Sequence, residues 1–385
     1  MLYREENNYL AIANRIIAEG YYDPPADSRT GIGAHKTHAE HMSFDLSNGN
    51  VPILSTRQVP YKNPIIELCW FASGDTDIKF LKDNNCSIWD SWVKPETAVY
   101  DSDLDLGLRE LEKQGVIKFG PDMQGQQARQ AFIYKYGDGL VNQLLSDLTG
   151  KTVPTRKLLS GSIGPGAYGA QWRKWEDIRA IPYNDETLEK KLLALGYTDM
   201  GDDIFPGAIL EANPALRIMV KKYDQLQAAI DRINEKPCDR RIVVSAWNPG
   251  RLDEAQLPPC HSFYQFLPFE KDGVKYLDLS LTCRSQDFLL GTVFNVMQYG
   301  VLCHLVAKLT GRKANRLYWT GNNTHIYDNQ KEIFLEYHSE RSPLKNDIKL
   351  IISDEVKSIA DFKPQHIQLT GYENFMEPIK YPVAV

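Results

Sequence analysis

Residues 257–266 place a thiol where it could act as a nucleophile. Their sequence is Leu-Pro-Pro-Cys-His-Ser-Phe-Tyr-Gln-Phe, so two prolines precede Cys260 and a strand-like alternation follows it. Proline fixes φ and has no N–H, so the pair predicts the start of a strand or an edge strand. A thiol at a strand end is expected to face a cleft. It attacks an electrophilic carbon only as the thiolate, which requires a nearby cation or helix N-terminus.

Four arginines could supply that cation and bind an anionic substrate. Arg29 lies in a glycine-rich turn, Arg240 and Arg241 are adjacent, and Arg284 precedes Ser285. Guanidinium groups bind phosphate oxygens bidentately, and a serine hydroxyl adds a donor. On a strand the two adjacent arginines would point to opposite faces, so both reach one phosphate only if the strand twists or one acts across a subunit interface. Taken singly, each arginine is more commonly a solvated surface residue.

Further polar side chains downstream could recognise a nucleotide. Asp287 and Asn295 flank Gly291, and Asn295 begins an apolar run, where it is either a helix N-cap or a reader of a base. Its amide has a donor and an acceptor, which match O4 and N3–H of uracil, whereas cytosine needs the reverse pattern. His325 and Tyr327 point the same way if the segment is extended and could bind a sugar; in a loop they are more commonly structural.

The composition excludes several classes of protein. The 385 residues are 43% hydrophobic and 24% charged, and the net charge of −6 argues against a broad basic face for nucleic acid. The sequence has no apolar run of 18 residues and begins with charged residues, which predicts a cytoplasmic protein without a membrane span or signal peptide. Six cysteines without CxxC or Cys/His spacing predict neither a metal site nor a disulfide framework.

Periodicity and turn residues predict the elements that must hold these side chains. Glu67 lies inside the apolar stretch of one predicted helix, where it is either buried and functional or at a solvated seam. Two polar stretches of helical composition, 94–160 and 176–215, are expected to be insertions in a single domain spanning 1–385. The predicted helices cover 5–19, 63–72, 219–236 and 295–309. The predicted strands cover 37–56, 240–249, 262–267, 276–283 and 316–320, with a loop through 330.

Several collinear motifs together resemble the folate-dependent thymidylate synthase family. They are Asn-Pro-Ile-Ile-Glu-Leu-Cys-Trp-Phe from 63, Ser-Ile-Trp-Asp-Ser-Trp from 87, Gly-Pro-Gly-Ala-Tyr-Gly-Ala-Gln-Trp from 164, Arg-Arg-Ile-Val-Val-Ser-Ala-Trp-Asn-Pro from 240, Leu-Pro-Pro-Cys-His from 257 and Ile-Lys-Tyr-Pro-Val-Ala-Val from 379. The resemblance implies an α/β (α+β) three-layer fold with a curved mixed sheet at a homodimer interface and a long buried central helix. It covers about residues 5 to 93 and 161 to the end.

The resemblance also assigns roles to individual residues. It implies that Cys260 adds to C6 of dUMP, so that C5 attacks 5,10-methylenetetrahydrofolate. Glu67 and Tyr168 would assist proton transfers, and Asn295 would select uracil, because the cytosine-using branch carries Asp there. Arg284, Asn295 and Asp287 also count among the catalytic positions. The implied nucleotide ligands are Arg29, Arg284, Ser285, Asn295, His261, His325 and Tyr327, with Arg240 and Arg241 reaching over from the partner subunit. The implied folate and closing-tail positions are Trp89, Trp92, Asp287, Gly291 and the carboxylate of Val385.

Departures from the family pattern bear on the product. They are Cys283 for glutamine, Val293 for proline, Gln298 for serine, Asn323 for aspartate and Gln330 for histidine, and the first four positions also change in phage pyrimidine hydroxymethylases. They predict that water adds to the methylene intermediate, giving 5-hydroxymethyl-dUMP for phage DNA modification. Gln298 lies one helical turn beyond Asn295, where its amide could hold that water.

Two alternatives remain beside the hydroxymethylase prediction. Trp89, Trp92 and the intact Pro-Val-Ala-Val tail favour hydride transfer and thymidylate synthase activity. A catalytically silent binder of nucleotide or RNA is the third interpretation. The joint presence of Cys260 and Glu67 with Tyr168 and Asn295 argues against it.

Overall fold

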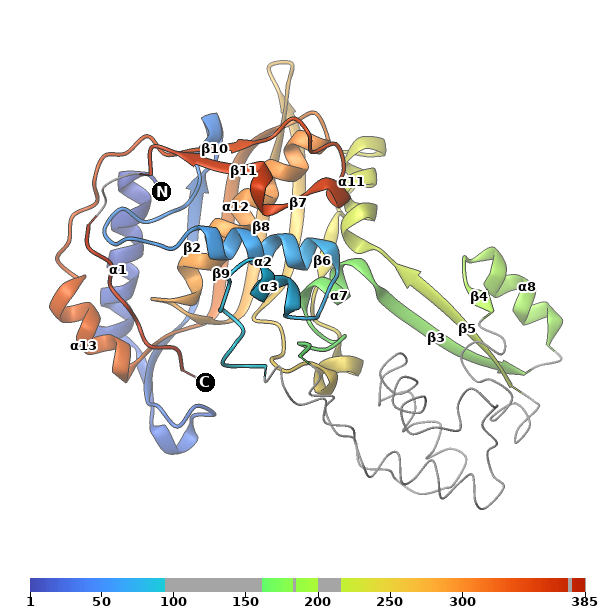
Figure 1. The fold of residues 1–385 in the computed structure, drawn as a ribbon, viewed down its shortest axis with the longest axis horizontal. Helices are drawn as coiled ribbons and strands as arrows, with labels where there is room; N and C mark the ends of the chain where they lie inside the picture. The colour runs from blue at the N-terminus through green and yellow to red at the C-terminus, as the bar shows by residue number, and fades with distance from the viewer. Residues whose placement is uncertain (94–160, 183–184, 200–215, 373–375, 385) are drawn as a thin grey trace.

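A computed structural model describes residues 1–93, 161–182, 185–199, 216–372 and 376–384. The first predicted insertion, 94–160, therefore lies outside the described residues, and the second, 176–215, is described in part. Figure 1 shows a main body that contains both termini and a smaller β-hairpin unit that projects from it. Within the described residues, no helix is both long and apolar enough to cross a membrane.

A six-stranded mixed sheet forms one side of the body. Its strand order is β1-β2-β9-β8-β7-β6, and every neighbouring pair is antiparallel except β8 and β9, which are parallel. Parallel neighbours need a crossover connection, and a helix after β8 provides it. The strands are β1 (Tyr21–Asp23), β2 (Ala34–Asp45), β6 (Val243–Ser245), β7 (His261–Lys271), β8 (Val274–Asp287) and β9 (Lys313–Tyr327).

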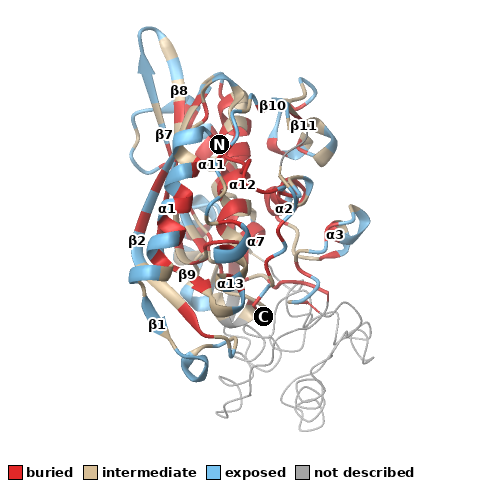
Figure 2. Cartoon of the chain, turned by 90° about the vertical axis from the view of Figure 1, so that its left-hand side faces the viewer, coloured by how far each residue is buried: buried red, intermediate tan, exposed pale blue. Residues whose placement is uncertain are grey.

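The crossover helix α12 (Gly291–Leu309) is the predicted buried central helix. It is apolar on all sides, so it must be enclosed, and it packs on β8 and β9 with α2 (Lys62–Ser73) on its other side. Figure 2 shows the resulting layers, with the sheet on one side, α12 in the middle and α2 with β10 (Lys349–Ile352) and β11 (Ile367–Thr370) on the other. The predicted mixed α+β architecture is confirmed.

Shorter helices complete the body. The remaining α-helices of the described body are α1 (Tyr3–Glu19), α3 (Lys79–Asp83), α7 (Tyr168–Arg173), α11 (Gln225–Glu235) and α13 (Asp328–Tyr337). Three of these helices bear on the site: α7 packs on α2, α3 follows α2, and α13 follows β9 directly.

The projecting unit corrects the prediction for 176–215 and for the start of the next helix. Residues 176–182, 198–199 and 219–223 were predicted to be helical but belong to the sheet β3-β5-β4, made of Trp175–Pro182, Leu216–Tyr223 and Thr198–Asp199. The helix α8 (Glu186–Ala194) beside this sheet agrees with the prediction. A small core of Ile181, Leu192, Tyr197 and Met219 holds this unit together. The predicted helix 219–236 begins only at Gln225, because β5 pairs along β3 and the Asp224 side chain then caps α11.

Other boundaries also differ from the predictions. The predicted strand 37–56 ends at Asp45. The predicted strand 240–249 shortens to β6, which leaves Arg240 and Arg241 in the preceding turn. The predicted loop after residue 320 is wrong, since β9 continues to Tyr327 along both β2 and β8. Because α12 begins at Gly291, Asn295 lies inside the helix and is not its N-cap.

Candidate active site

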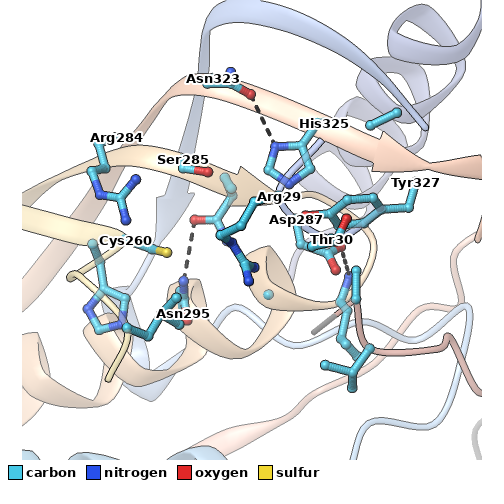
Figure 3. Close-up of a pocket in the computed structure, with 18 of the residues that line it drawn as sticks. Arg29, Thr30, Cys260, Arg284, Ser285, Asp287, Asn295, Asn323, His325 and Tyr327 are labelled. Atoms are coloured by element: carbon cyan, nitrogen blue, oxygen red, sulfur yellow. Dashed lines mark hydrogen bonds between the residues drawn. The ribbon is translucent and has the colours of Figure 1, made fainter. Parts of the chain in front are cut away.

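One cavity of about 550 Å³ collects most of the predicted site residues, and Figure 3 draws 18 of the residues that line it and labels ten of them. It opens where the carboxyl end of β8, the start of β7 and the first turns of α12 meet. The predicted residues that line it are Arg29, Glu67, Trp89, Trp92, Tyr168, Cys260, His261, Arg284, Ser285, Asp287, Gly291, Asn295, His325 and Tyr327. Val385 lies outside the described residues, and the neighbouring Val383 and Ala384 line the cavity.

Cys260 immediately precedes β7, as the two prolines predict. Strand β7 lies between β6 and β8, so the prolines mark a strand start and not an edge strand. The Cys260 N–H donates to the Tyr168 hydroxyl at 2.8 Å, and its carbonyl accepts from the Arg284 N–H at 2.8 Å. The Arg284 guanidinium donates to the carbonyl oxygens of Pro258 at 2.7 Å and Pro259 at 2.9 Å. Arg284 therefore fixes the backbone that carries the thiol.

Burial and the nearby positive charges shift the pKa of the Cys260 thiol in opposite directions. Burial raises the pKa of Cys260, whereas Arg284, a hydrogen bond with Tyr168 and Arg29 lower it, and Asp287 adds a smaller rise. The arginines act in the expected direction, but burial outweighs them. The net effect without a ligand is a raised pKa of the thiol, and whether bound nucleotide shifts Cys260 toward the thiolate stays a prediction. Burial also lowers the pKa of His261 to about 3, so this imidazole is neutral and contributes no positive charge.

Tyr168 supports the thiol from the start of α7. Its ring stacks on Phe71 at a centroid distance of 4.7 Å and lies 4.2 Å from the His261 ring. Burial raises the pKa of Tyr168 well above its usual value, so the phenol keeps its proton. Helix α7 approaches α2 closely because the next residue is Gly169, where a Cβ would lie 2.5 Å from the Phe71 carbonyl oxygen.

Glu67 is buried in the interior of α2 and faces the cavity. Trp89 Nε1 donates to its Oε1 at 2.6 Å, and Gln298 Nε2 donates to its Oε2. Burial raises the pKa of Glu67 to about 7, although both hydrogen bonds lower it. The alternative of a solvated seam is thereby excluded. A carboxyl with this pKa exchanges protons near neutral pH.

Gln298 lies on α12 one turn beyond Asn295, as predicted, and its side chain contacts Glu67. Its Nε2 donates to Glu67 and to the Pro64 carbonyl at 3.1 Å, and its buried Oε1 has no hydrogen-bond partner among the described residues. It lies behind Glu67 and is not one of the residues that line the cavity. Its contact with the cavity is therefore indirect, through Glu67, and the predicted role of its amide in holding water stays a prediction.

Arg29 and Arg284 are held at the cavity by aromatic rings. The Arg284 guanidinium carbon lies 5.1 Å from the centroid of Trp247, and that of Arg29 lies 5.3 Å from the centroid of Trp92. Ser285 follows Arg284 on β8 and lines the same cavity. The structure thus brings together three of the five predicted phosphate ligands.

Arg240 and Arg241 lie elsewhere in this chain. They line a separate depression with Lys236, Cys238 and Asp239, and Arg241 Nε pairs with Asp239 Oδ1 at 2.9 Å. Since they occupy a turn, the argument that a strand points them to opposite faces does not apply. Their predicted reach into a partner's cavity stays a prediction.

His325 and Tyr327 point into the cavity from β9, as i and i+2 positions of a strand should (Figure 3). Their rings meet edge to face at 5.0 Å, and His325 Nδ1 is 3.1 Å from Asn323 Oδ1. Burial lowers the pKa of His325, while nearby Asp287 opposes that shift. The interpretation of the pair as structural loop residues is excluded by the strand geometry.

Asn295 faces the cavity from the second turn of α12. Its Nδ2 donates to Oε1 of Gln286 at 3.3 Å (dashed line from Asn295 in Figure 3). Gln286 is buried and lines the cavity, yet the sequence argument did not single it out. Its place between Ser285 and Asp287, shortly after the predicted strand 276–283, was the available signal.

The opposite end of the cavity carries the predicted folate positions and the C-terminal tail. Trp89, Trp92, Leu290 and Phe294 give it apolar walls. Asp287 lies at its base, where it accepts from the Leu290 N–H at 3.1 Å. Burial raises the pKa of Asp287, and His325 together with hydrogen bonds from Gln330 and Leu290 opposes the rise.

Gln330 joins the tail to Asp287. Its Nε2 donates to Asp287 Oδ2 at 2.8 Å and to the Pro382 carbonyl oxygen at 3.0 Å. Because both partners are acceptors, one amide nitrogen serves both at once. The side chain is completely buried, so it links the cavity floor to the segment that covers the cavity.

Two arginines and a histidine hold the rest of the tail. Arg57 is buried, donates to the carbonyl oxygens of Leu289 at 2.7 Å and Ile379 at 3.3 Å, and lies 5.0 Å from the centroid of Tyr381. Arg341 bridges the carbonyls of Thr56 at 2.8 Å and Glu377 at 3.1 Å. His338 Nδ1 is 2.9 Å from the Tyr381 hydroxyl. None of these three residues was predicted from the sequence, although Arg57 closely follows the apolar run 51–54.

The described residues contain no group of three or more His, Cys, Asp or Glu side chains that could hold a metal ion.

Comparisons with known proteins agree with the motifs. A family model described as Thymidylate synthase matches residues 7–385. A protein named thymidylate synthase from Listeria monocytogenes serotype 4b (strain CLIP80459) is 33% identical over 368 residues, which cover 93% of this chain and 94% of the relative. Another of that name from Leuconostoc mesenteroides subsp. mesenteroides is 32% identical over 390 residues, covering 99% of each chain. The latter relative therefore has nearly the same length as this chain.

Proposed function

The chain belongs to the thymidylate synthase family, and we propose that it is a cytoplasmic thymidylate synthase. Members of this family transfer one carbon from 5,10-methylenetetrahydrofolate to C5 of dUMP. The proposed products are dTMP and dihydrofolate. The observation that supports this most is the convergence in one cavity of a strand-end thiol, two arginines, a buried carboxyl and an amide on a rigid helix.

Each part of the cavity suits one part of the nucleotide. Arg29, Arg284 and Ser285 can donate to the phosphate, and His325 with Tyr327 can bind the sugar. Asn295 can pair with the uracil edge, which would place the ring across the cavity from the phosphate site. This placement would bring C6 of the ring to Cys260.

The proposed reaction begins with addition of the Cys260 sulfur to C6. A C–S bond forms, and the electron pair of the C5–C6 double bond moves to C5 and O4, where Glu67 and bound water can stabilise it. C5 then forms a bond to the folate methylene carbon and loses its proton, with Tyr168 positioned to assist. Elimination of the folate leaves an exocyclic methylene. Hydride transfer from the folate converts it to the methyl group, the C–S bond breaks, and the folate is oxidised to dihydrofolate.

The tail supports reduction rather than hydration as the last step. Hydride transfer requires that the folate stay in the site and that water stay out. Val383 and Ala384 line the cavity, and Gln330, Arg57 and Arg341 hold the segment that carries them. The curated relatives carry the name thymidylate synthase, which also supports this product.

Hydroxymethylation of dUMP is the second candidate, and one observation favours it. Gln298 donates to Glu67, and its buried Oε1 lacks a partner among the described residues. A small movement of this amide would offer a polar site behind the carboxyl at which water could be held. The departures at Cys283, Val293 and Asn323 remain consistent with this product.

Product analysis distinguishes the two candidates. Purified protein is incubated with dUMP and 5,10-methylenetetrahydrofolate, and the nucleotides and folates are separated by liquid chromatography and identified by mass. We expect dTMP and dihydrofolate in equal amounts. Formation of 5-hydroxymethyl-dUMP with tetrahydrofolate would reject the synthase proposal and establish the second candidate. Absence of any product, with dUMP binding retained, would support the silent binder.

The family is typically dimeric, and the outer face of the sheet fits a homodimer contact. Exposed apolar side chains project from it, including Tyr21, Phe263, Leu267, Phe269 and Tyr318. We propose that Arg240 and Arg241 reach the phosphate in the partner's cavity. Mixing inactive Arg241→Ala and Cys260→Ala proteins should then restore activity, because one site of each mixed dimer is complete. No recovery after subunit exchange would reject the shared site.

A further inference from the structure

Gln286 has a position that the proposed function does not explain. It lies on β8 between two residues assigned to the substrates, and its side chain is 2% exposed. Its amide reaches the first turns of α12, where Oε1 accepts from Asn295 Nδ2 at 3.3 Å. No other hydrogen bond of the Asn295 side chain is found within the part of the chain that the structure describes.

Packing on α12 restricts where the Gln286 amide can lie. A Cβ at Gly291 would be 2.9 Å from Gln286 Nε2, so the nitrogen end of the amide rests on the glycine while the oxygen end faces Asn295. Gly291 and Asn295 are four residues apart and therefore share one face of the helix. The missing side chain at 291 makes room for this amide.

We propose that Gln286 is a positioning residue for base selectivity, because it fixes which end of the Asn295 amide faces each part of the pyrimidine ring. The inference rests on the proposed role of Asn295 in reading the base. With one Nδ2 hydrogen directed to Gln286, the second can donate to O4 of uracil while Oδ1 accepts from N3–H.

Cytosine would require the opposite arrangement. Its N4 amino group is a donor and its N3 an acceptor, so Asn295 would have to rotate its amide by half a turn. That rotation would bring Asn295 Oδ1 against Gln286 Oε1 and break the existing hydrogen bond. Restoring the bond would require the Gln286 amide, which packs against Gly291, to turn over as well. Gln286 thus disfavours cytosine without touching the base.

Two variants at position 286 test the hydrogen-bond acceptor of the side chain separately from its volume. Gln286→Met keeps a similar volume and removes the acceptor, and Gln286→Glu keeps oxygen acceptors in place of the amide. The dissociation constants of dUMP and dCMP are measured by calorimetry on the full chain for wild type and both variants. Each ratio comes from one preparation, so a partly inactive sample changes both constants alike. Should Gln286→Met not fold, Gln286→Ala replaces it.

The expected result is a dCMP-to-dUMP ratio of dissociation constants that falls about tenfold in Gln286→Met and stays within about threefold of wild type in Gln286→Glu. The inference would be overturned if the dCMP-to-dUMP ratio in Gln286→Met stayed within about threefold of wild type, or if the ratio fell equally in both variants. Either result would leave the proposed function intact. Wild-type protein that binds neither nucleotide would overturn both.

Discussion

The nucleotide end and the tail end of the cavity are built in different ways. At the nucleotide end, Cys260, Arg284 and Asn295 are carried by strand ends and a buried helix, whose backbone hydrogen bonds fix them. At the tail end, residues 376–384 form neither helix nor strand, and side chains such as Arg57 and Gln330 hold the segment.

The reacting groups and the segment that closes the cavity are therefore held by different kinds of contact. Groups held by a hydrogen-bonded ladder open only with the fold, whereas a segment held by a few side chains can be released locally. Substitutions at the nucleotide end should therefore abolish the reaction, and those at the tail end should weaken folate retention in graded steps.

Cys260→Ala should have the largest effect. Without the sulfur no covalent adduct forms, so we expect kcat to fall by on the order of ten-thousandfold or more. Nucleotide binding should stay within a few fold of wild type, because the arginines and Asn295 remain. Single-turnover assays and dUMP calorimetry on the same protein test both parts. Substantial turnover by this variant would remove the nucleophile from the mechanism.

Glu67→Gln tests the buried carboxyl. We expect kcat to fall by on the order of a hundredfold to a thousandfold, since proton transfer by a positioned group contributes about that much. Wild-type pH–rate data should show a limb near pH 7 that is missing in this variant. In Gln298→Leu the limb should move to higher pH, because a donor that lowers the Glu67 pKa is lost. An unchanged limb in Glu67→Gln would assign it to another group.

Glu67→Gln should also stabilise the fold above neutral pH. The pKa of Glu67 is about 7 when folded against a usual 4.5, so the folded state binds this proton more tightly than the unfolded state. Stability is therefore lost as pH rises from 4.5 to 7, by on the order of 3 kcal/mol. Urea unfolding should show Glu67→Gln more stable than wild type at pH 8 by about 1–3 kcal/mol, with a smaller gain at pH 5.5. A gain that does not shrink at pH 5.5 would contradict this linkage.

Gln330→Leu tests the link between tail and cavity floor. Loss of its bonds to Asp287 and Pro382 should raise KM for the folate and lower kcat, each by about tenfold, because a buried acceptor loses its donor. The dUMP dissociation constant should not change. Gln330→His is the matched control, since imidazole can again donate to Asp287. An equal loss of dUMP affinity would show that the two ends are not independent.

Tyr381→Phe should have the smallest effect. It removes the hydroxyl that meets His338 and keeps the ring on Arg57, so we expect KM for the folate to rise by about threefold or less. Steady-state kinetics at saturating dUMP measure this. A change larger than that of Gln330→Leu would reverse the proposed order of tail contacts.

The sequence predicted the nucleotide end far better than the tail end. A strand start at Cys260 and a buried helix carrying Asn295 follow from local patterns, because prolines and apolar runs act over a few residues. The same-side arrangement of His325 and Tyr327 was predicted only for an extended segment, and β9 supplies that segment where a loop was predicted. The motifs placed the remaining cavity residues, since their order along the chain is that of the family.

The contacts that sequence reasoning missed are long-range. Gln286 meets Asn295 and Gln330 meets Pro382 only because separate elements converge, and no local pattern marks such a pair. The strands of the projecting unit were missed for a related reason, because β3 and β5 are defined by pairing across more than 30 residues. The weight of burial over positive charge at Cys260 likewise required the packed structure.

The most direct test of the central claim is a trapped covalent complex. The protein is incubated with 5,10-methylenetetrahydrofolate and 5-fluoro-dUMP, whose fluorine cannot leave C5 as a cation, so the reaction should stop after both bonds have formed. Intact-mass spectrometry and peptide mapping should show one nucleotide and one folate joined to the peptide that carries Cys260. No added mass, or attachment at any other residue, would contradict the mechanism.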